Sequence, residues 1–247
     1  NCRLQFPMAS AIGNCHWELP VAFAICIALS LAVDTSLKWY QGQLHGLYRL
    51  ILGIAVLWWV VSLLMVLAYP KYTSFWRNSR AIRTVFGLLT LIPTWVAVIA
   101  LRTSLYDVDP LYGASLIFYV LGIVWAADIG AFFVGVKFGR HKLRPNVSPG
   151  KSLEGLLGGI AASFAIIAFA ALHYQVEPSR IVLHLAIGGI TVAVSALGDL
   201  NESMLKRCAG IKDSGRILPG HGGVLDRIDS LTAAFPVFAF CYVTWMA

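Results

Sequence analysis

The feature that most constrains this chain is a series of long apolar segments separated by shorter polar ones. A helix that crosses a membrane needs about 20 mostly apolar residues, and seven segments approach or meet that length. Their uniform apolar character excludes strands of a membrane β-barrel, which would alternate apolar and polar residues. We therefore expect an all-α, polytopic transmembrane helix bundle of about seven spans: 20–36, 50–69, 84–101, 113–136, 155–173, 181–198 and 231–247.

Composition supports this fold class and removes others. Of the 247 residues, 58% are hydrophobic and 13% are charged, whereas soluble chains average about 25% charged residues. This balance excludes a disordered chain, a collagen-like repeat and a water-soluble enzyme with one core. The five cysteines are scattered, with no CxxC pair and no metal-ligand spacing, so they predict small apolar packing residues.

The basic residues predict an orientation in the membrane. Most of the 19 lysines and arginines lie in three connecting segments, 70–83, 137–154 and 199–230, which alternate onto one side of the bundle. Basic loops usually face the cytoplasm. We therefore expect a multi-pass protein of the cell (inner) membrane with its active site on the cytoplasmic side. The net charge of +7 then fits loops beside anionic lipid, and no motif predicts a nucleic-acid partner.

We divide the chain into an N-terminal transmembrane region, 1–112, and a C-terminal transmembrane catalytic region, 113–247. The second region contains Asp128 inside an apolar span. An ionisable group at that depth is costly, so it should face the bundle interior or a wet cavity and find a partner there. The alternative is an aspartate that serves only the packing of neighbouring helices.

The sequence NVSPGKSLEG at 146–155 superficially resembles a nucleotide-binding loop. The P-loop interpretation fails, because Pro145 stands where the motif needs glycine and the segment follows a membrane helix rather than a strand. Lys151 and Ser152 still lie just before a helix expected from about Leu153, where a phosphate could bind. A solvated basic loop is the alternative. Gly155 and Gly159, four residues apart, predict close helix packing.

Segment 198–230 combines acids, bases and a glycine-rich turn. If the sixth span continues as a helix, Asp199, Glu202 and Lys206 share one face, and Asp226 and Asp229 share a face where the last helix starts. Mg²⁺ is usually held by one or two carboxylates plus substrate phosphates. We expect these acids to converge with Asp128 on such a site, although local ion pairs in a solvated loop are the alternative.

The same segment resembles the signature of the phosphatidate cytidylyltransferase (CDP-diacylglycerol synthase) family. The sequences at 128–131 and 148–151 are also similar to family segments, and a weaker similarity extends back to about Trp17. Family members usually have further transmembrane sequence before that point, so we expect an N-terminally incomplete member. The matching residues are Ser203, Lys206, Arg207, Lys212, Asp213, Pro219, His221, Gly222, Gly223, Asp226, Arg227 and Asp229.

The resemblance implies that CTP and phosphatidic acid react to give CDP-diacylglycerol and pyrophosphate. It implies one or two Mg²⁺ ions held by Asp199 and Asp226, with Asp128 and Asp229 as secondary ligands, and it leaves a homodimer open. Catalytic roles fall to Asp199, Asp226, Lys212 and Asp213. His221 positions phosphate or shapes its turn. The residues implied to bind substrate phosphates are Lys151, Ser203, Lys206, Arg207, His221, Gly222, Gly223 and Arg227.

Two other functions stay open. A CTP-dependent kinase of a membrane polyprenol would transfer the γ-phosphoryl group instead of the cytidylyl group. An ion-coupled transporter would use Asp128 as an ion ligand, but it predicts broken helices in two related halves, and the sequence shows no internal symmetry. A CDP-alcohol phosphotransferase is excluded, because the nearest stretch, DRIDSLTAA, lacks the glycine and arginine of its DxxDGxxAR motif.

Overall fold

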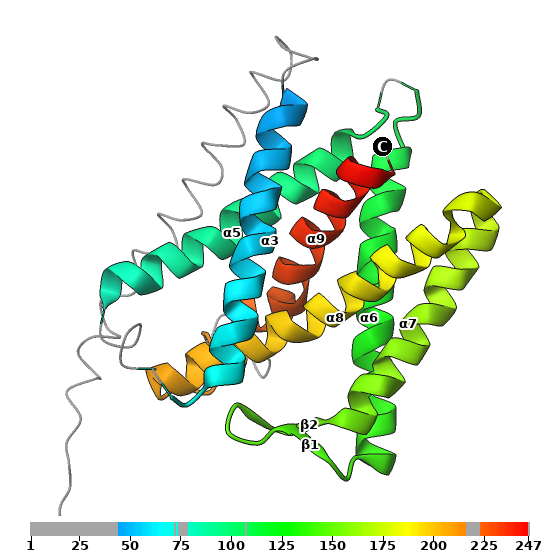
Figure 1. Cartoon of the computed structure of the whole chain (residues 1–247). Helices are drawn as coiled ribbons and strands as arrows, with labels where there is room; N and C mark the ends of the chain where they lie inside the picture. Colours follow the sequence, from blue (N-terminus) through cyan, green and yellow to red (C-terminus); the bar gives the residue numbers. More distant parts are fainter. Residues whose placement is uncertain (1–43, 72, 74–78, 107, 216–222, 247) are drawn as a thin grey trace, which may run out of the picture.

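The computed structural model describes residues 44–71, 73, 79–106, 108–215 and 223–246, which form six long helices and one β-hairpin (Figure 1). Each helix is long and apolar enough to cross a membrane. The predicted polytopic helix bundle is therefore confirmed, and the expected span 20–36 lies outside the described residues. The helices are α3 (Leu44–Ala68), α5 (Arg80–Thr103), α6 (Tyr112–Phe138), α7 (Leu153–His173), α8 (Pro178–Ala209) and α9 (Leu225–Trp245).

Local sequence signals set several helix ends. The Ser79 hydroxyl accepts a hydrogen bond from the Ile82 amide at the start of α5, and Ser152 does the same for Gly155 at the start of α7. Such N-caps satisfy amide groups that have no partner within the helix. At its end α8 stops at Gly210, whose φ of +70° is a conformation that glycine adopts at little cost.

Helices α6 and α7 pack closely because glycines line their contact. A Cβ atom added to Gly159 would lie 2.5 Å from the carbonyl oxygen of Ala127, and one added to Gly155 would lie 2.9 Å from that of Ala131. No larger residue fits without moving a backbone. The packing role predicted for these two glycines is confirmed.

Helix α9 lies in the centre of the bundle and packs against α3, α5 and α8. Its buried Phe238 belongs to one core with Leu52 of α3, Leu101 of α5 and Ile123 of α6. The predicted N-terminal and C-terminal regions therefore share a core among the described residues. Their division at residues 112 and 113 stays a prediction.

Two features of the fold bring polar residues to one end of the bundle. Helix α8 has 32 residues, a length of about 48 Å at 1.5 Å per residue. The acids after residue 198 therefore lie on the same continuous helix as the apolar residues before them. The second feature is an antiparallel hairpin of β1 (Lys142–Arg144) and β2 (Ser148–Ser152), where the sequence predicted only a basic loop. The hairpin lies at the same end as the last turns of α3 and α8 (Figure 1).

Candidate active site

A cavity of about 760 Å³ opens between the hairpin and helices α6, α7, α8 and α9. Some of the side chains that line it are apolar, among them Phe132, Val136, Ile160 and Val192. The lining also includes most of the residues predicted for the site. These are Asp128, Lys151, Asp199, Ser203, Lys206, Arg207, Lys212, Asp213, Asp226, Arg227 and Asp229.

His221 and Gly222 lie outside the described residues. Their neighbour Gly223 is described and buried, and its amide donates a 2.7 Å hydrogen bond to Asp226.

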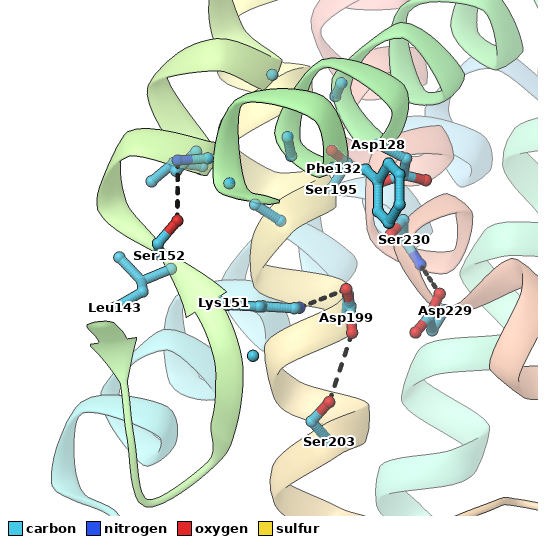
Figure 2. A pocket seen from close by; sticks show the side chains of 18 of the residues that line it. Asp128, Phe132, Leu143, Lys151, Ser152, Ser195, Asp199, Ser203, Asp229 and Ser230 are labelled. Atoms are coloured by element: carbon cyan, nitrogen blue, oxygen red, sulfur yellow. Dashed lines mark hydrogen bonds and ion pairs between the residues drawn. The ribbon is translucent and has the colours of Figure 1, made fainter. Parts of the chain in front are cut away.

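Asp199 connects α8 to the hairpin at the cavity wall and contacts two other polar side chains. Lys151, which β2 carries, forms an ion pair with its Oδ2 atom, and the Ser203 hydroxyl donates to its Oδ1 atom at 3.4 Å (Figure 2). Asp199 and Ser203 are one helical turn apart, so they lie on the same stripe of α8. The carboxylate and the lysine ammonium group therefore meet at the cavity wall, although they come from distant parts of the sequence.

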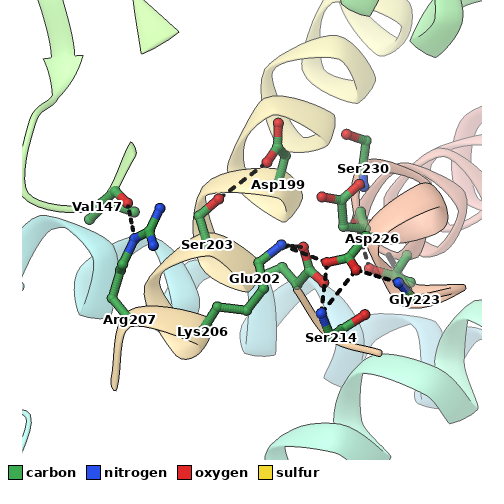
Figure 3. Close-up of polar contacts among 12 residues, drawn as sticks. Val147, Asp199, Glu202, Ser203, Lys206, Arg207, Ser214, Gly223, Asp226 and Ser230 are labelled. Carbon is green, nitrogen blue, oxygen red and sulfur yellow. Dashed lines mark hydrogen bonds and ion pairs between the residues drawn. The ribbon is translucent and has the colours of Figure 1, made fainter. Parts of the chain in front are cut away.

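A second cluster joins α8 to α9 around Lys206. Its Nζ atom lies 2.7 Å from Glu202 Oε2 and 2.7 Å from Asp226 Oδ1 (Figure 3). Asp226 also accepts hydrogen bonds from the backbone amides of Ser214, at 2.9 Å, and Gly223, at 2.7 Å. Asp226 therefore fastens both flanks of the glycine-rich segment to the end of α8.

Glu202 belongs to this cluster, although the sequence predicts no individual role for it. Its side chain is buried, and its Oε1 atom has no hydrogen-bond partner within the part of the chain that the structure describes. The sequence contains a signal for its position, since Glu202 precedes Lys206 by four residues, the spacing at which helix side chains pair. A buried carboxylate oxygen without a donor leaves a place for a proton or a cation.

The remaining acids add negative charge to the cavity. Asp229 is close enough to Asp199 and Glu202 for their charges to repel, and Asp128 interacts in the same way with Asp199 while Lys151 attracts it. Asp229 Oδ1 also accepts the Ser230 amide at 2.8 Å. The acids of α6, α8 and α9 thus converge, as the sequence predicted.

These residues fit Mg²⁺ that binds together with a phosphate ligand. Among the described residues no three acidic, histidine or cysteine side chains form a complete metal cage. Mg²⁺ does not need one, because it keeps several waters and uses one or two carboxylates with substrate phosphates. The converging acids and the unsatisfied Glu202 oxygen supply suitable hard oxygen donors.

Positive side chains balance the acids and could hold phosphate groups. Lys212 and Arg227 line the cavity with the two paired lysines. Arg207 also lines it, and its Nε atom donates a 3.3 Å hydrogen bond to the carbonyl oxygen of Val147 on the hairpin. A cavity with carboxylates, several cations and apolar side chains can bind a metal–polyphosphate complex next to a molecule with hydrocarbon chains.

Known cytidylyltransferases are similar to this chain over most of its length. The cytidylyltransferase family model matches residues 9–245. A phosphatidate cytidylyltransferase of Haemophilus influenzae is 48% identical over 198 residues, which are 78% of this chain and 68% of that protein. The enzyme of the same name from Pseudomonas aeruginosa is 46% identical over 215 residues, 87% of this chain and 76% of that protein. The Bacillus subtilis one is 38% identical over 184 residues, 73% of this chain and 66% of that protein.

Proposed function

Because this chain belongs to the cytidylyltransferase family, we propose that it transfers the cytidylyl group of CTP to phosphatidic acid. The products are CDP-diacylglycerol, a precursor of phospholipids, and pyrophosphate. The observation that carries the proposal is the mixed lining of the cavity, which holds Asp199 and several basic side chains together with apolar side chains of α6, α7 and α8. Such a cavity suits a reaction between a polyanionic nucleotide and a membrane lipid.

In the proposed reaction an oxygen of the lipid phosphate attacks the α-phosphorus of CTP, and pyrophosphate leaves with the electron pair of the broken bond. Phosphoryl transfers of this kind depend mainly on positioning and charge neutralisation. Lys151, Lys206, Lys212 and Arg227 would bind the phosphates of the two substrates. Asp213, adjacent to Lys212 on the cavity wall, would help to orient that lysine.

Asp199 and Asp226 would hold Mg²⁺, with Asp128 and Asp229 as secondary ligands, and the ion would neutralise charge on the triphosphate. Lysine ammonium groups now contact both principal carboxylates. Each lysine is therefore already beside the place where phosphate charge would enter. The proposed phosphate contacts of His221 and Gly222 rest on the family resemblance alone.

The six apolar helices make the chain a multi-pass membrane protein. Beyond this, we propose that it lies in the cell (inner) membrane with the cavity toward the cytoplasm, where CTP is dissolved. The three basic segments support this orientation through the usual bias of cytoplasmic loops. We propose no nucleic-acid partner, and a homodimer stays a prediction.

Product identification tests the proposed function. The purified chain would be given CTP, Mg²⁺ and either phosphatidic acid or a polyprenol, and the products would be analysed by mass spectrometry. We expect a CDP-lipid and pyrophosphate from phosphatidic acid. CDP and a phosphorylated polyprenol would instead establish the kinase, and ion flux without any nucleotide product would establish the transporter.

A further inference from the structure

The β1–β2 hairpin lies along α8 and is attached to it at two points. Lys151 of the hairpin pairs with Asp199 (Figure 2), and the carbonyl oxygen of Val147 accepts the Arg207 hydrogen bond at 3.3 Å (Figure 3). On α8, Asp199 and Arg207 lie on one stripe with Ser203 between them, because each step is four residues. The attachment points therefore follow one face of the helix.

The two attachment points are separated by similar lengths of helix α8 and of the hairpin. Eight residues of α-helix from Asp199 to Arg207 rise about 12 Å, and the four residues from the turn residue Val147 to Lys151 of β2 would span about 13 Å if fully extended. The segment is therefore long enough to reach both points, even with the irregular register between β1 and β2. Successive side chains of a strand point to opposite faces. The rotation of β2 about its own axis therefore determines whether Lys151 points toward Asp199 or away from it.

The two ends of the hairpin are fixed by different contacts. At its base, Glu154 accepts hydrogen bonds from the amides of Arg140 and His141, and Ser152 caps α7. Near its tip, Val147 is only 1% exposed and belongs to the main core. An isolated two-stranded hairpin is at best marginally stable in water, so the tip depends on this burial and on the Arg207 hydrogen bond.

From these contacts we infer that Arg207 is a positioning residue, which fastens the hairpin tip to α8 and thereby aims Lys151 into the cavity. The inference rests on the proposed function for its effect on turnover, since Lys151 is a proposed phosphate ligand. The contact itself does not depend on the reaction. The competing role for Arg207 is direct and independent binding of substrate phosphate.

A measurement without substrate tests the contact. The full chain in detergent would be treated with trypsin, and cleavage after the exposed Lys142 of the hairpin would be followed by mass spectrometry. Arg207→Gln should accelerate this cleavage severalfold. The matched control is Arg102→Gln, because Arg102 also donates to a backbone carbonyl, that of Pro110 at 3.1 Å, outside the site. An Arg207→Gln cleavage rate equal to that of the control would overturn the inference.

Val147→Ala tests the other support of the tip, its buried side chain, and leaves the Arg207 hydrogen bond to the backbone carbonyl intact. It trims the buried tip, so it should also accelerate cleavage after Lys142. If Arg207→Gln does not fold, Arg207→Lys replaces it as the test: lysine keeps the charge but has no Nε–H group to donate to the Val147 carbonyl oxygen. Arg207→Lys should also accelerate cleavage, and a rate equal to that of the control would overturn the inference.

A double-mutant cycle tests whether Arg207 acts through Lys151. Arg207→Gln should lower kcat/KM by roughly tenfold, the loss expected for one charge-assisted hydrogen bond. In a Lys151→Gln background the same substitution should cost less than about twofold, because residues that act through one contact are not additive. Full multiplicative effects would establish independent phosphate binding instead. If the wild-type chain makes no CDP-lipid, the proposed function fails, while the cleavage rates still decide the contact.

Discussion

Lys206 on α8 and Asp226 on α9 are joined by a 2.7 Å ion pair, and both side chains are largely buried. Glu202 is a second acceptor for the same ammonium group. Removing one partner of a buried pair leaves an uncompensated charge, which costs more than the pair itself contributes. The junction between α8 and α9 is therefore where a single substitution should have the clearest effect on the site.

Asp226→Asn should abolish most turnover while the chain stays in the membrane. Asparagine keeps the size of the side chain, but it loses the negative charge that faces Lys206 and the proposed metal. We expect CDP-lipid formation to fall by about 100-fold or more, the scale found when a preorganised electrostatic contact is removed. The measurement is product formation by mass spectrometry, with membrane fractionation as the control for insertion. Activity near that of the wild type would remove Asp226 from the metal site.

Chelation should stop the reaction reversibly. Because no complete metal cage is present among the described side chains, the proposed Mg²⁺ should exchange readily rather than remain bound. EDTA should reduce CDP-lipid formation to background, and excess Mg²⁺ should restore it. The thermal unfolding temperature of the substrate-free protein should change little in either case. Turnover that persists in EDTA would exclude an exchangeable divalent cation.

Gly159→Ala should destabilise the bundle. Its new Cβ atom would lie 2.5 Å from the Ala127 carbonyl oxygen, so α6 and α7 must separate. Overpacking of this kind typically costs about 1–3 kcal/mol. The matched control is Gly87→Ala, where a new Cβ atom would meet nothing within 4 Å. Thermal unfolding in detergent should show a lower Tm for Gly159→Ala alone, and equal Tm values would contradict the packing account.

Ser152→Ala and Ser79→Ala remove the same kind of helix cap from two helices. Each should cost about 1 kcal/mol of stability, because one amide of the first helical turn loses its acceptor. Only Ser152 lines the cavity and adjoins Lys151. Ser152→Ala should therefore also lower kcat/KM, whereas Ser79→Ala should not. The test compares Tm and turnover for both variants, and an equal loss of turnover would show that Ser152 contributes stability alone.

Much of the fold could be predicted because apolar segment length directly reflects membrane thickness. The predicted span 155–173 is almost the observed α7, which begins at Leu153. The span 181–198 was too short, because hydropathy falls after Gly198 although the helix continues to Ala209. A helix end is set by its cap, here Gly210, and not by the last apolar residue.

The hairpin could not be predicted from the same signals. Its strands contain Lys142, Arg144, Pro149 and Lys151, and they show none of the alternation typical of a half-buried strand. It forms because Val147 is buried in the core and both its ends are tied to helices. These are long-range contacts, which local sequence patterns do not report.

The site was predictable as a set of residues but not as a set of pairs. Motif spacing placed Asp199, Lys206 and Asp226 together, and the cavity lining agrees. The sequence could not assign Lys151 to Asp199 or Lys206 to Asp226, since any of the cations could meet any of the acids. Three-dimensional packing makes that choice, and it also gave Glu202 its place in the cluster.

The continuity of α8 has a consequence for how the enzyme would respond to its surroundings. The helix that crosses the apolar layer also carries four polar residues of the site: Asp199, Ser203, Lys206 and Arg207. A bilayer of different thickness changes the tilt of a spanning helix, and here such a tilt would move all four side chains together past the hairpin and α9. A change in lipid composition would therefore alter the geometry of the site through hydrophobic mismatch, without any lipid bound in the cavity.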